Sequence, residues 1–174
     1  HQIINVGLIG LGRIGKMHAK NICEKLPLLN LKSIADPKPD LEFIQNLGGT
    51  TLHEDAQEII SDKNIDAIII SSPTPTHFNL IKKCLRNNKH VFCEKPISFS
   101  ENEINEIIDL MVIQESFVQV GLNRRFDEEF ILLKEKIKEG LIGKTQIIHI
   151  TNHDSTIPRF KFLKSSGGML FDLC

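Results

Sequence analysis

The sequence contains no tryptophan and no tyrosine, and it lacks an excess of charge of either sign, because 21 lysines and arginines stand against 22 aspartates and glutamates. A formal net charge of -1 at pH 7 gives no attraction for nucleic acid or for an anionic membrane surface. No apolar run reaches the ~18 residues of a membrane-spanning helix, and the N-terminus lacks the features of a signal peptide. We therefore expect a cytoplasmic protein with neither a membrane nor a nucleic acid as partner.

The four cysteines are scattered, without a Cys-x-x-Cys pair. This spacing is typical of reduced thiols in a cytosol rather than of a disulfide framework. The sequence also lacks a metal-ligand cluster and a Gly-x-Ser-x-Gly turn, so we expect neither a metal nor a serine nucleophile. With 174 residues, of which 41% are hydrophobic, the chain can bury a substantial core.

The most informative stretch is an apolar run near the N-terminus that leads into Gly10-x-Gly12-x-x-Gly15 and then into a helix-compatible segment. This is the pattern of a dinucleotide-binding strand, turn and helix. Gly10 permits the tight turn, Gly12 lets backbone N–H groups approach a pyrophosphate, and Gly15 lets the helix pack close to the strand. The pyrophosphate would then lie at a helix N-terminus, where unpaired N–H groups favour negative charge.

An acidic residue supports this interpretation. A second apolar strand, at residues 29–35, ends in Asp36, at about the ~20-residue spacing from the glycines that dinucleotide sites show. A carboxylate there accepts hydrogen bonds from the adenosine ribose hydroxyls and repels a 2′-phosphate, so we expect NAD rather than NADP, with Lys38 close enough to soften the preference. The alternative is that Asp36 only begins the Asp36-Pro37 turn.

Strand and helix patterns alternate through residue 121, which predicts a Rossmann-like α/β fold with one doubly wound parallel sheet. Ligands of such sheets bind at the carboxyl ends of the strands, so the strand ends at residues 10–15, 71–77 and 94–96 should face one crevice. Ser100 and Glu103 have the spacing of a capping box at the start of the next helix. Residues 1–121 are therefore predicted to form an NAD-binding domain.

A second α/β domain is predicted to begin at residue 122 and to run to residue 174. A polar segment at residues 123–127 starts a helix that has apolar residues on one face, and residues 146–151 predict a strand. Apolar residues continue to Cys174, so we expect this second domain to be incomplete in the chain.

Together these motifs resemble the Gfo/Idh/MocA oxidoreductases, the family of glucose-fructose oxidoreductase and inositol dehydrogenase, and within it the inositol 2-dehydrogenases. Five elements carry the resemblance, and they are residues 7–15, 72–77, 94–96 and 123–127 and the Gly167-Gly168 pair with Asp172. The resemblance spans the whole chain. It implies a second domain with a large open sheet that usually mediates oligomerisation, so we expect a homo-oligomer, a dimer or a tetramer, at full length.

The resemblance also implies a catalytic arrangement. In enzymes that this chain resembles, the lysine of Glu94-Lys95-Pro96 lies beside the nicotinamide and an Asp-x-x-x-His pair completes the site. Lys95 would hold the reacting hydroxyl, and Asp172 would orient Lys95 and a histidine that acts as general base. That histidine would fall two positions past Cys174, outside this sequence. The expected substrate contacts are Arg124, Arg125 and His153. The expected cofactor-binding residues are Gly10, Gly12, Arg13, Ile14, Asp36, Ser72, Pro73, His77, Glu94 and Lys95.

Each of these residues has an ordinary structural alternative. Lys95 could be a surface lysine at a strand end, and Asp172 a solvated loop carboxylate. For His77, in the first turn of a helix, we expect a structural or cofactor-side role rather than proton transfer. The two arginines could form ion pairs with Asp127 at a helix start.

The leading hypothesis is an NAD-dependent dehydrogenase that oxidises a secondary hydroxyl of a cyclic polyol or sugar, with inositol first, by hydride transfer to nicotinamide. One alternative is an NAD(H)-binding regulatory or non-catalytic protein, and another is a nucleotide-sugar or glucose-fructose type oxidoreductase of the same family. The sequence leaves open the exact substrate, the oligomeric state, the strictness of NAD over NADP and whether these 174 residues are active by themselves.

Overall fold

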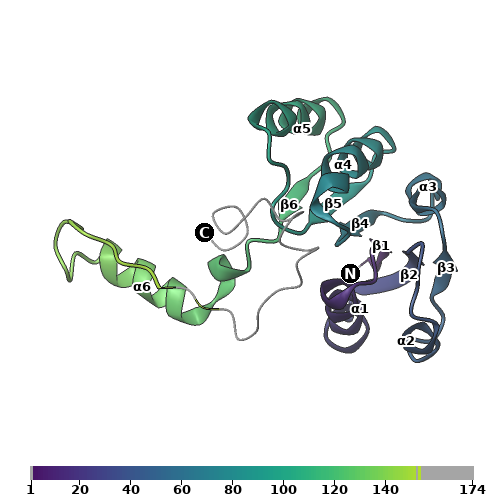
Figure 1. The fold of residues 1–174 in the computed structure, drawn as a ribbon, viewed down its shortest axis with the longest axis horizontal. Coiled ribbons are helices and arrows are strands. Elements are labelled where there is room, and N and C mark those ends of the chain that lie inside the picture. Colours follow the sequence, from purple (N-terminus) through teal and green to yellow (C-terminus); the bar gives the residue numbers. More distant parts are fainter. Residues whose placement is uncertain (1, 152, 154–174) are drawn as a thin grey trace. The chain divides into compact units, whose positions relative to one another are not determined.

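A computed structural model describes residues 2–151 and 153 of the protein (Figure 1). The chain divides into two compact units, His1–Val120 and Gly121–Cys174. The sequence expectations for Asp172 and for the preceding pair of glycines lie outside the described residues.

The first unit alternates strands and helices along the chain. Its strands are β1 (Ile4–Ile9), β2 (Leu29–Ala35), β3 (Thr51–His53), β4 (Ala67–Ile70), β5 (His90–Cys93) and β6 (Val118–Val120). Its helices are α1 (Arg13–Lys25), α2 (Leu41–Gln45), α3 (Ala56–Ser61), α4 (His77–Arg86) and α5 (Glu101–Ile113), together with the short 3-10 helix η1 (Thr74–Thr76). The expected alternation is therefore present.

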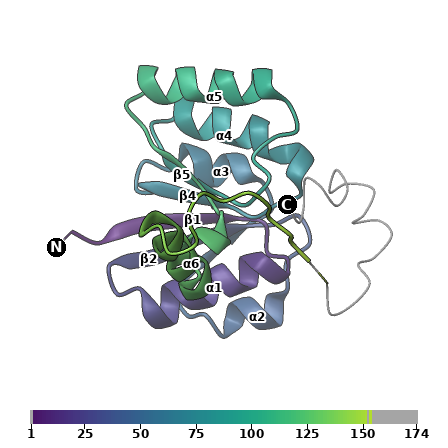
Figure 2. The same ribbon diagram turned by 90° about the vertical axis from the view of Figure 1, so that its left-hand side faces the viewer.

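The six strands form one parallel sheet in the order β3-β2-β1-β4-β5-β6. Helices α1 and α2 cover one face, and α3, α4 and α5 cover the other (Figure 2). The chain builds outward from β1 in one direction and from β4 in the other, so the order reverses between these two strands, which is where such sheets bind ligands. The prediction of a doubly wound, Rossmann-type sheet is confirmed.

Both faces of the sheet are buried, which explains why the strands are apolar at consecutive positions. On one face, Leu8 and Ile34 belong to a core cluster with Ile22 of α1. On the other face, Ile68 of β4 belongs to a second cluster with Leu85 of α4 and with residues of α3 and α5. A one-residue slip would exchange the side chains of these two faces, which pack against different helices, so the packing of the two clusters specifies the register of the central strands.

The start of α5 differs from the expected capping box. Ser100 is the N-cap residue, but the hydroxyl that reaches the Glu103 carboxylate belongs to Ser98. The Ser98 hydroxyl oxygen also accepts a hydrogen bond from the backbone N–H of Ser100 at 2.9 Å. In a capping box, the Ser100 N–H and the Glu103 carboxylate would bond to each other, but here both contact the Ser98 hydroxyl. The prediction of a Ser100–Glu103 box is wrong.

The described part of the second unit contains a 3-10 helix, η2 (Asn123–Phe126), and one α-helix, α6 (Glu128–Lys138). Asp127 caps α6, because its carboxylate accepts hydrogen bonds from the N–H groups of Glu129 and Phe130 at 3.1 and 3.2 Å. Residues 146–151 are not a strand, which corrects the sequence expectation. A β-strand exists only through hydrogen bonds to a neighbour, and the described part of this unit offers no second strand.

A buried lysine joins the start of β5 to the connection before β4. Lys89 is 6% exposed, and its Nζ donates hydrogen bonds to the backbone carbonyls of Asp62 and Ile65, both at 2.6 Å. Burial lowers the pKa of the Lys89 ammonium from its ordinary value. The two carbonyl contacts, together with attraction from the Asp62 and Asp66 carboxylates, offset part of this desolvation.

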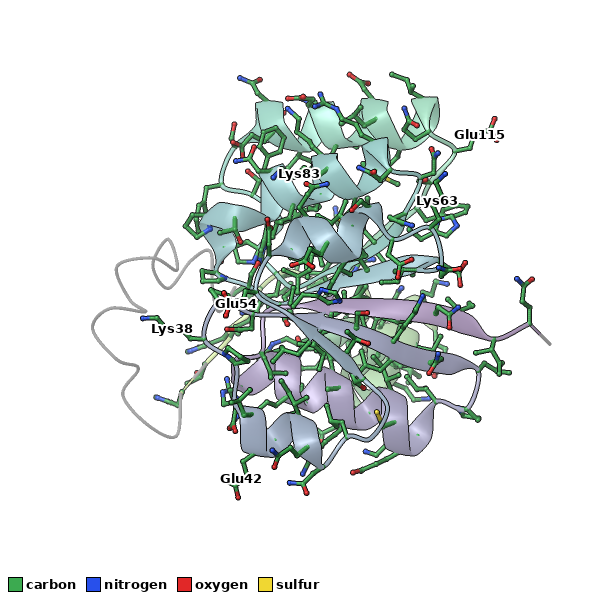
Figure 3. The ribbon with its side chains drawn as sticks, turned by 90° about the vertical axis from the view of Figure 1, so that its right-hand side faces the viewer. Lys38, Glu42, Glu54, Lys63, Lys83 and Glu115 are labelled. Carbon is green, nitrogen blue, oxygen red and sulfur yellow. The ribbon has the colours of Figure 1, made fainter. Side chains whose placement is uncertain are left out.

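We expect Lys89→Met to lower the free energy of unfolding by about 1–3 kcal/mol, because two buried carbonyl oxygens lose their donor. Lys83→Met is the matched control, since Lys83 lies exposed on the neighbouring helix α4 (Figure 3), and it should change stability by less than about 0.5 kcal/mol. Chemical denaturation followed by circular dichroism measures both. Equal stabilities for the two variants would show that the Lys89 contacts contribute nothing.

Candidate functional site

The loops that follow β1, β4 and β5 begin at the same edge of the sheet. The three strands are neighbours, and the register pairs Ile9 with Ile70 and Ile70 with Cys93. Each of these residues is the last in its strand, so the segments that follow lie side by side at the carboxyl ends. The structure thus brings together the three segments that the sequence singled out in the first unit.

Two of the three glycines of the first turn are required by close packing. Gly10 has a φ of +93°, and a Cβ there would lie 2.6 Å from the backbone nitrogen of Ser72. A Cβ on Gly15 would lie 2.0 Å from the carbonyl oxygen of Gly10 and 2.8 Å from the Ser71 hydroxyl oxygen. The turn after β1, the start of α1 and the end of β4 therefore approach more closely than any side chain permits.

Close packing does not explain the glycine at position 12. Apart from Gly12 itself and its two neighbours in the chain, no atom of the described residues lies within 4 Å of the position that a Cβ would take. Gly12 is the N-cap of α1, which begins at Arg13 and has no acidic residue in its first turn. The first N–H groups of an α-helix lack partners within the helix, and the helix dipole adds positive potential there. The open space beside Gly12 therefore adjoins a backbone surface that favours an anion, with Arg13 and Ile14 as its first residues.

Asp36 is hydrogen-bonded to this same turn. Its half-buried carboxylate accepts a hydrogen bond from the Leu11 N–H at 2.6 Å and another from the Lys38 N–H at 2.8 Å. The second bond is the turn contact of the structural alternative, and the first links β2 to the glycine turn. A carboxylate has about four acceptor sites, so each oxygen keeps capacity for a further donor such as a ribose hydroxyl.

Lys16, on the helix that follows the glycine turn, is paired with a carboxylate. Lys16 of α1 forms an ion pair with Asp40, the N-cap of α2, and its ammonium lies 5.3 Å from the centre of the Phe43 ring. The hydrogen bond from Lys16 holds the pKa of the Asp40 carboxyl below its ordinary value. Sequence reasoning missed this pair, because nothing in the local pattern links residues from two different helices.

His77 connects two of the three segments. The side chain is 1% exposed, and its Nε2 and Nδ1 atoms lie 2.8 Å from the carbonyl oxygens of Ser72 and Pro96 respectively. Through these two contacts the His77 ring joins the segment after β4 to the segment after β5. Ser72 also contacts Thr76 through its hydroxyl at 2.6 Å, while Pro73 between them is exposed.

Glu94 and Lys95 follow β5 directly and are both half-buried. The N–H of Glu94 donates to the carbonyl of Ile70 at 2.9 Å and extends the pairing of β4 with β5 by one step. The Glu94 Oε1 atom lies 2.8 Å from Nε2 of His18 in α1. Sequence reasoning did not single out His18, although its position, three residues after Gly15, places it on the α1 face that packs toward the sheet.

The remaining candidates belong to the second unit. Arg124 and Arg125 lie in η2, and the Arg124 guanidinium carbon is 5.2 Å from the centre of the Phe130 ring. Both arginines line an open hollow of about 720 Å³ along α6. His153 is exposed.

Two kinds of feature are absent from the residues that the structure describes. Within residues 2–151 and 153, no three or more His, Cys, Asp and Glu side chains gather as they would around a metal ion. Over the same residues, no helix has the length and apolar composition that crossing a membrane requires.

Comparison with known proteins identifies relatives over nearly the whole chain. Residues 4–122 match the model of an oxidoreductase family with an NAD-binding Rossmann fold. Myo-inositol 2-dehydrogenase of Thermotoga maritima is 37% identical over 98% of this chain and 51% of its own length. The chain thus spans about half the length of the curated relatives that it matches.

Solved structures of related dehydrogenases have a fold similar to that of this chain. A probable dehydrogenase from Thermotoga maritima superimposes with a TM-score of 0.88 at 37% identity, over 98% of this chain and 51% of that one. A scyllo-inositol dehydrogenase from Lactobacillus casei, with bound NAD(H) and scyllo-inositol, does so with a TM-score of 0.76 at 33% identity, over 82% of this chain and 43% of that one. Since residues 4–122 match this family model and both sequence and fold agree with those of the relatives over most of the chain, the chain belongs to the Gfo/Idh/MocA oxidoreductase family.

Proposed function

We propose that the protein is an NAD-dependent dehydrogenase that oxidises a secondary hydroxyl of a cyclic polyol, with inositol as the leading substrate. The observation that carries the proposal is the bond from the Leu11 N–H to Asp36, which joins the glycine turn to the acidic residue. A turn that binds pyrophosphate and a carboxylate that binds ribose are then parts of one unit. The substrate class is supported by the relatives named as inositol dehydrogenases.

The residues present fit a dinucleotide. The N–H groups of Arg13 and Ile14, at the uncrowded start of α1 beside Gly12, would hold the pyrophosphate. The Asp36 carboxylate would accept hydrogen bonds from the adenosine ribose. Ser72, Pro73 and Glu94, at the adjoining strand ends, would line the path toward the nicotinamide. When bound, NAD supplies the acceptor for a hydride.

Lys95 would provide the positive charge at the substrate. Its ammonium would bind the reacting hydroxyl and stabilise the negative charge that develops on that oxygen as its proton leaves. Asp172 would orient this lysine and the histidine that takes the proton. Residues 1–121 would thus form the cofactor domain, and residues 122–174 would begin the domain that holds the substrate, with Arg124, Arg125 and His153 near it, and that assembles the oligomer.

The proposal is tested on the gene product at its natural length. We expect NADH to form, as followed by absorbance, with myo-inositol or scyllo-inositol in a panel of polyols, sugars and nucleotide sugars. Lys95→Met should lower kcat by at least about 100-fold, because it removes a donor to the developing oxyanion, while the Kd for NAD changes little. Lys63→Met is the control. Lys63 is exposed, and it lies at the opposite end of the strands from Lys38, which marks the side of Asp36 in Figure 3.

Three outcomes would contradict parts of this proposal. NAD binding without turnover of any compound in the panel would favour the regulatory alternative. Turnover of a nucleotide sugar or of glucose alone would change the substrate class. An unchanged kcat in Lys95→Met would remove this lysine from the reaction.

The two helix-start glycines should respond differently to alanine. Gly12→Ala meets open space, so it should change stability by less than about 1 kcal/mol, yet its methyl group would occupy the pyrophosphate position and weaken NAD binding by about tenfold or more. Gly15→Ala meets the Gly10 carbonyl, so it should destabilise the fold by more than about 2 kcal/mol, despite the helix propensity of alanine. Thermal unfolding and calorimetric titration with NAD separate the two effects, and equal losses of stability would refute the distinction.

Asp36→Ala should weaken NAD binding by about 10- to 100-fold, because a charged acceptor for two hydroxyls is lost. It should also narrow the difference between the NAD and NADP affinities, since the repulsion of a 2′-phosphate disappears. Asp36→Asn is the matched variant, because its amide oxygen keeps an acceptor for the Leu11 N–H while the charge is lost and the second oxygen becomes an NH2 donor. Calorimetry with both cofactors gives the NAD and NADP affinities of the wild type and of the two variants. If both variants keep the affinities of the wild type, Asp36 does not contact the ribose.

A further inference from the structure

His18 and Glu94 form a partly buried pair that joins α1 to the end of β5. The Nε2 atom of His18 lies 2.8 Å from Glu94 Oε1, and the two side chains are 17% and 22% exposed. The His18 ring also packs edge-on against the Phe92 ring, with the ring centres 5.3 Å apart and the planes at 69°. The imidazole is therefore held both by a polar contact and by an aromatic one.

The pair lies between the start of α1 and the proposed catalytic lysine. His18 lies on the α1 face that also carries the buried Gly15, so it sits about one helical turn beyond the close contact with β1. Glu94 is the residue immediately before Lys95. The contact thus runs from the helix whose first turn would hold the pyrophosphate to the residue beside the proposed catalytic lysine.

The segment around Lys95 is attached on both sides. Before it, the Glu94 backbone pairs with Ile70 and the Glu94 side chain contacts His18. After it, the Pro96 carbonyl lies 2.8 Å from the buried ring of His77. The strand pairing and His77 anchor this segment to β4 and α4, and His18 anchors it to α1. Loss of His18 would leave the first two attachments in place and remove the direct tie to the glycine-turn helix.

We infer that His18 is a positioning residue, which holds the Glu94–Lys95 segment in register with α1 and so aligns Lys95 with a dinucleotide bound at the start of that helix. The functional part of this inference rests on the proposed dehydrogenase activity. His18 acts through Glu94, so its loss should misplace Lys95 without removing any group that touches the reacting hydroxyl. An error of about 1 Å in such a group lowers turnover by up to ~100-fold.

The variants His18→Leu and His18→Gln separate positioning from simple packing. Leucine fills much of the ring volume without a donor, whereas glutamine carries an amide N–H that reaches about as far as Nε2. His53→Leu is the matched control, because His53 Nδ1 forms a similar contact with Glu58 at 3.0 Å. His53 lies at the end of β3, in another part of the sheet. All three variants are made in the gene product at its natural length.

The first measurement needs no cofactor. In hydrogen exchange, we expect the amides of Lys95 and Ile97 to exchange at least about threefold faster in His18→Leu, with α4 and α5 unchanged, because local opening becomes easier. His18→Gln should restore most of the protection, and His53→Leu should leave it intact. Unchanged exchange in His18→Leu, or equal acceleration throughout the unit, would overturn the inference.

The second measurement is kinetic. His18→Leu should lower kcat about tenfold or more while the KM for the polyol stays within about threefold, and His18→Gln should recover most of kcat. A fall in stability with an unchanged kcat would assign His18 to packing alone and overturn the inference. If the wild-type protein binds no NAD, the proposed function fails, and the exchange measurement alone still decides whether His18 positions the Lys95 segment.

Discussion

Glycine at position 15 lets α1 approach the end of β1 so closely that its Cα faces the Gly10 carbonyl, where a Cβ would lie at 2.0 Å. The Ser71 hydroxyl donates to the same carbonyl at 2.8 Å and adds the end of β4 to this contact. The rest of the carboxyl edge depends on this approach. It sets where the first N–H groups of α1 point, and one turn later it brings His18 within reach of Glu94. A helix held farther from the sheet could do neither.

The distribution of charge along this edge matches the proposed ligand. Acidic groups stand at both ends, at Asp36 beside β1 and β2 and at Glu94 after β5, and each is already fixed by a donor from another segment. Between them lies the start of α1, where backbone N–H groups and the helix dipole favour an anion. A dinucleotide has hydroxyl-rich ribose units on either side of its phosphates. Carboxylates at the ends and N–H groups in the middle provide acceptors and donors in the same order.

Much of this arrangement was predictable because it follows from local sequence. Consecutive apolar positions indicated strands buried on both faces, and the spacing of glycines and Asp36 indicated the turn and the acid beside it. The contacts between distant segments were not predictable. His18 and Glu94 are 76 residues apart, and the carbonyl partners of Lys89 come from another loop, so no periodicity marks either one.

Two local predictions failed for physical reasons. The Ser100–Glu103 pattern was correct in spacing, but Ser98 competes for the same groups. Residues 146–151 have the composition of a strand, but a strand also needs a partner, which the described part of that unit does not supply. Composition thus gives a preference for a structure, and the neighbours that are present decide whether it forms.

The open space beside Gly12 has a kinetic consequence. Because no described atom beyond Gly12 and its chain neighbours lies within 4 Å of a Cβ at this position, a phosphate arriving at this point would displace solvent rather than other parts of the protein. A preformed site of this kind requires no opening step before the ligand enters. At this point of the edge, the first contact of a phosphate with the N–H groups of α1 would therefore need no movement of the glycine turn or of α1.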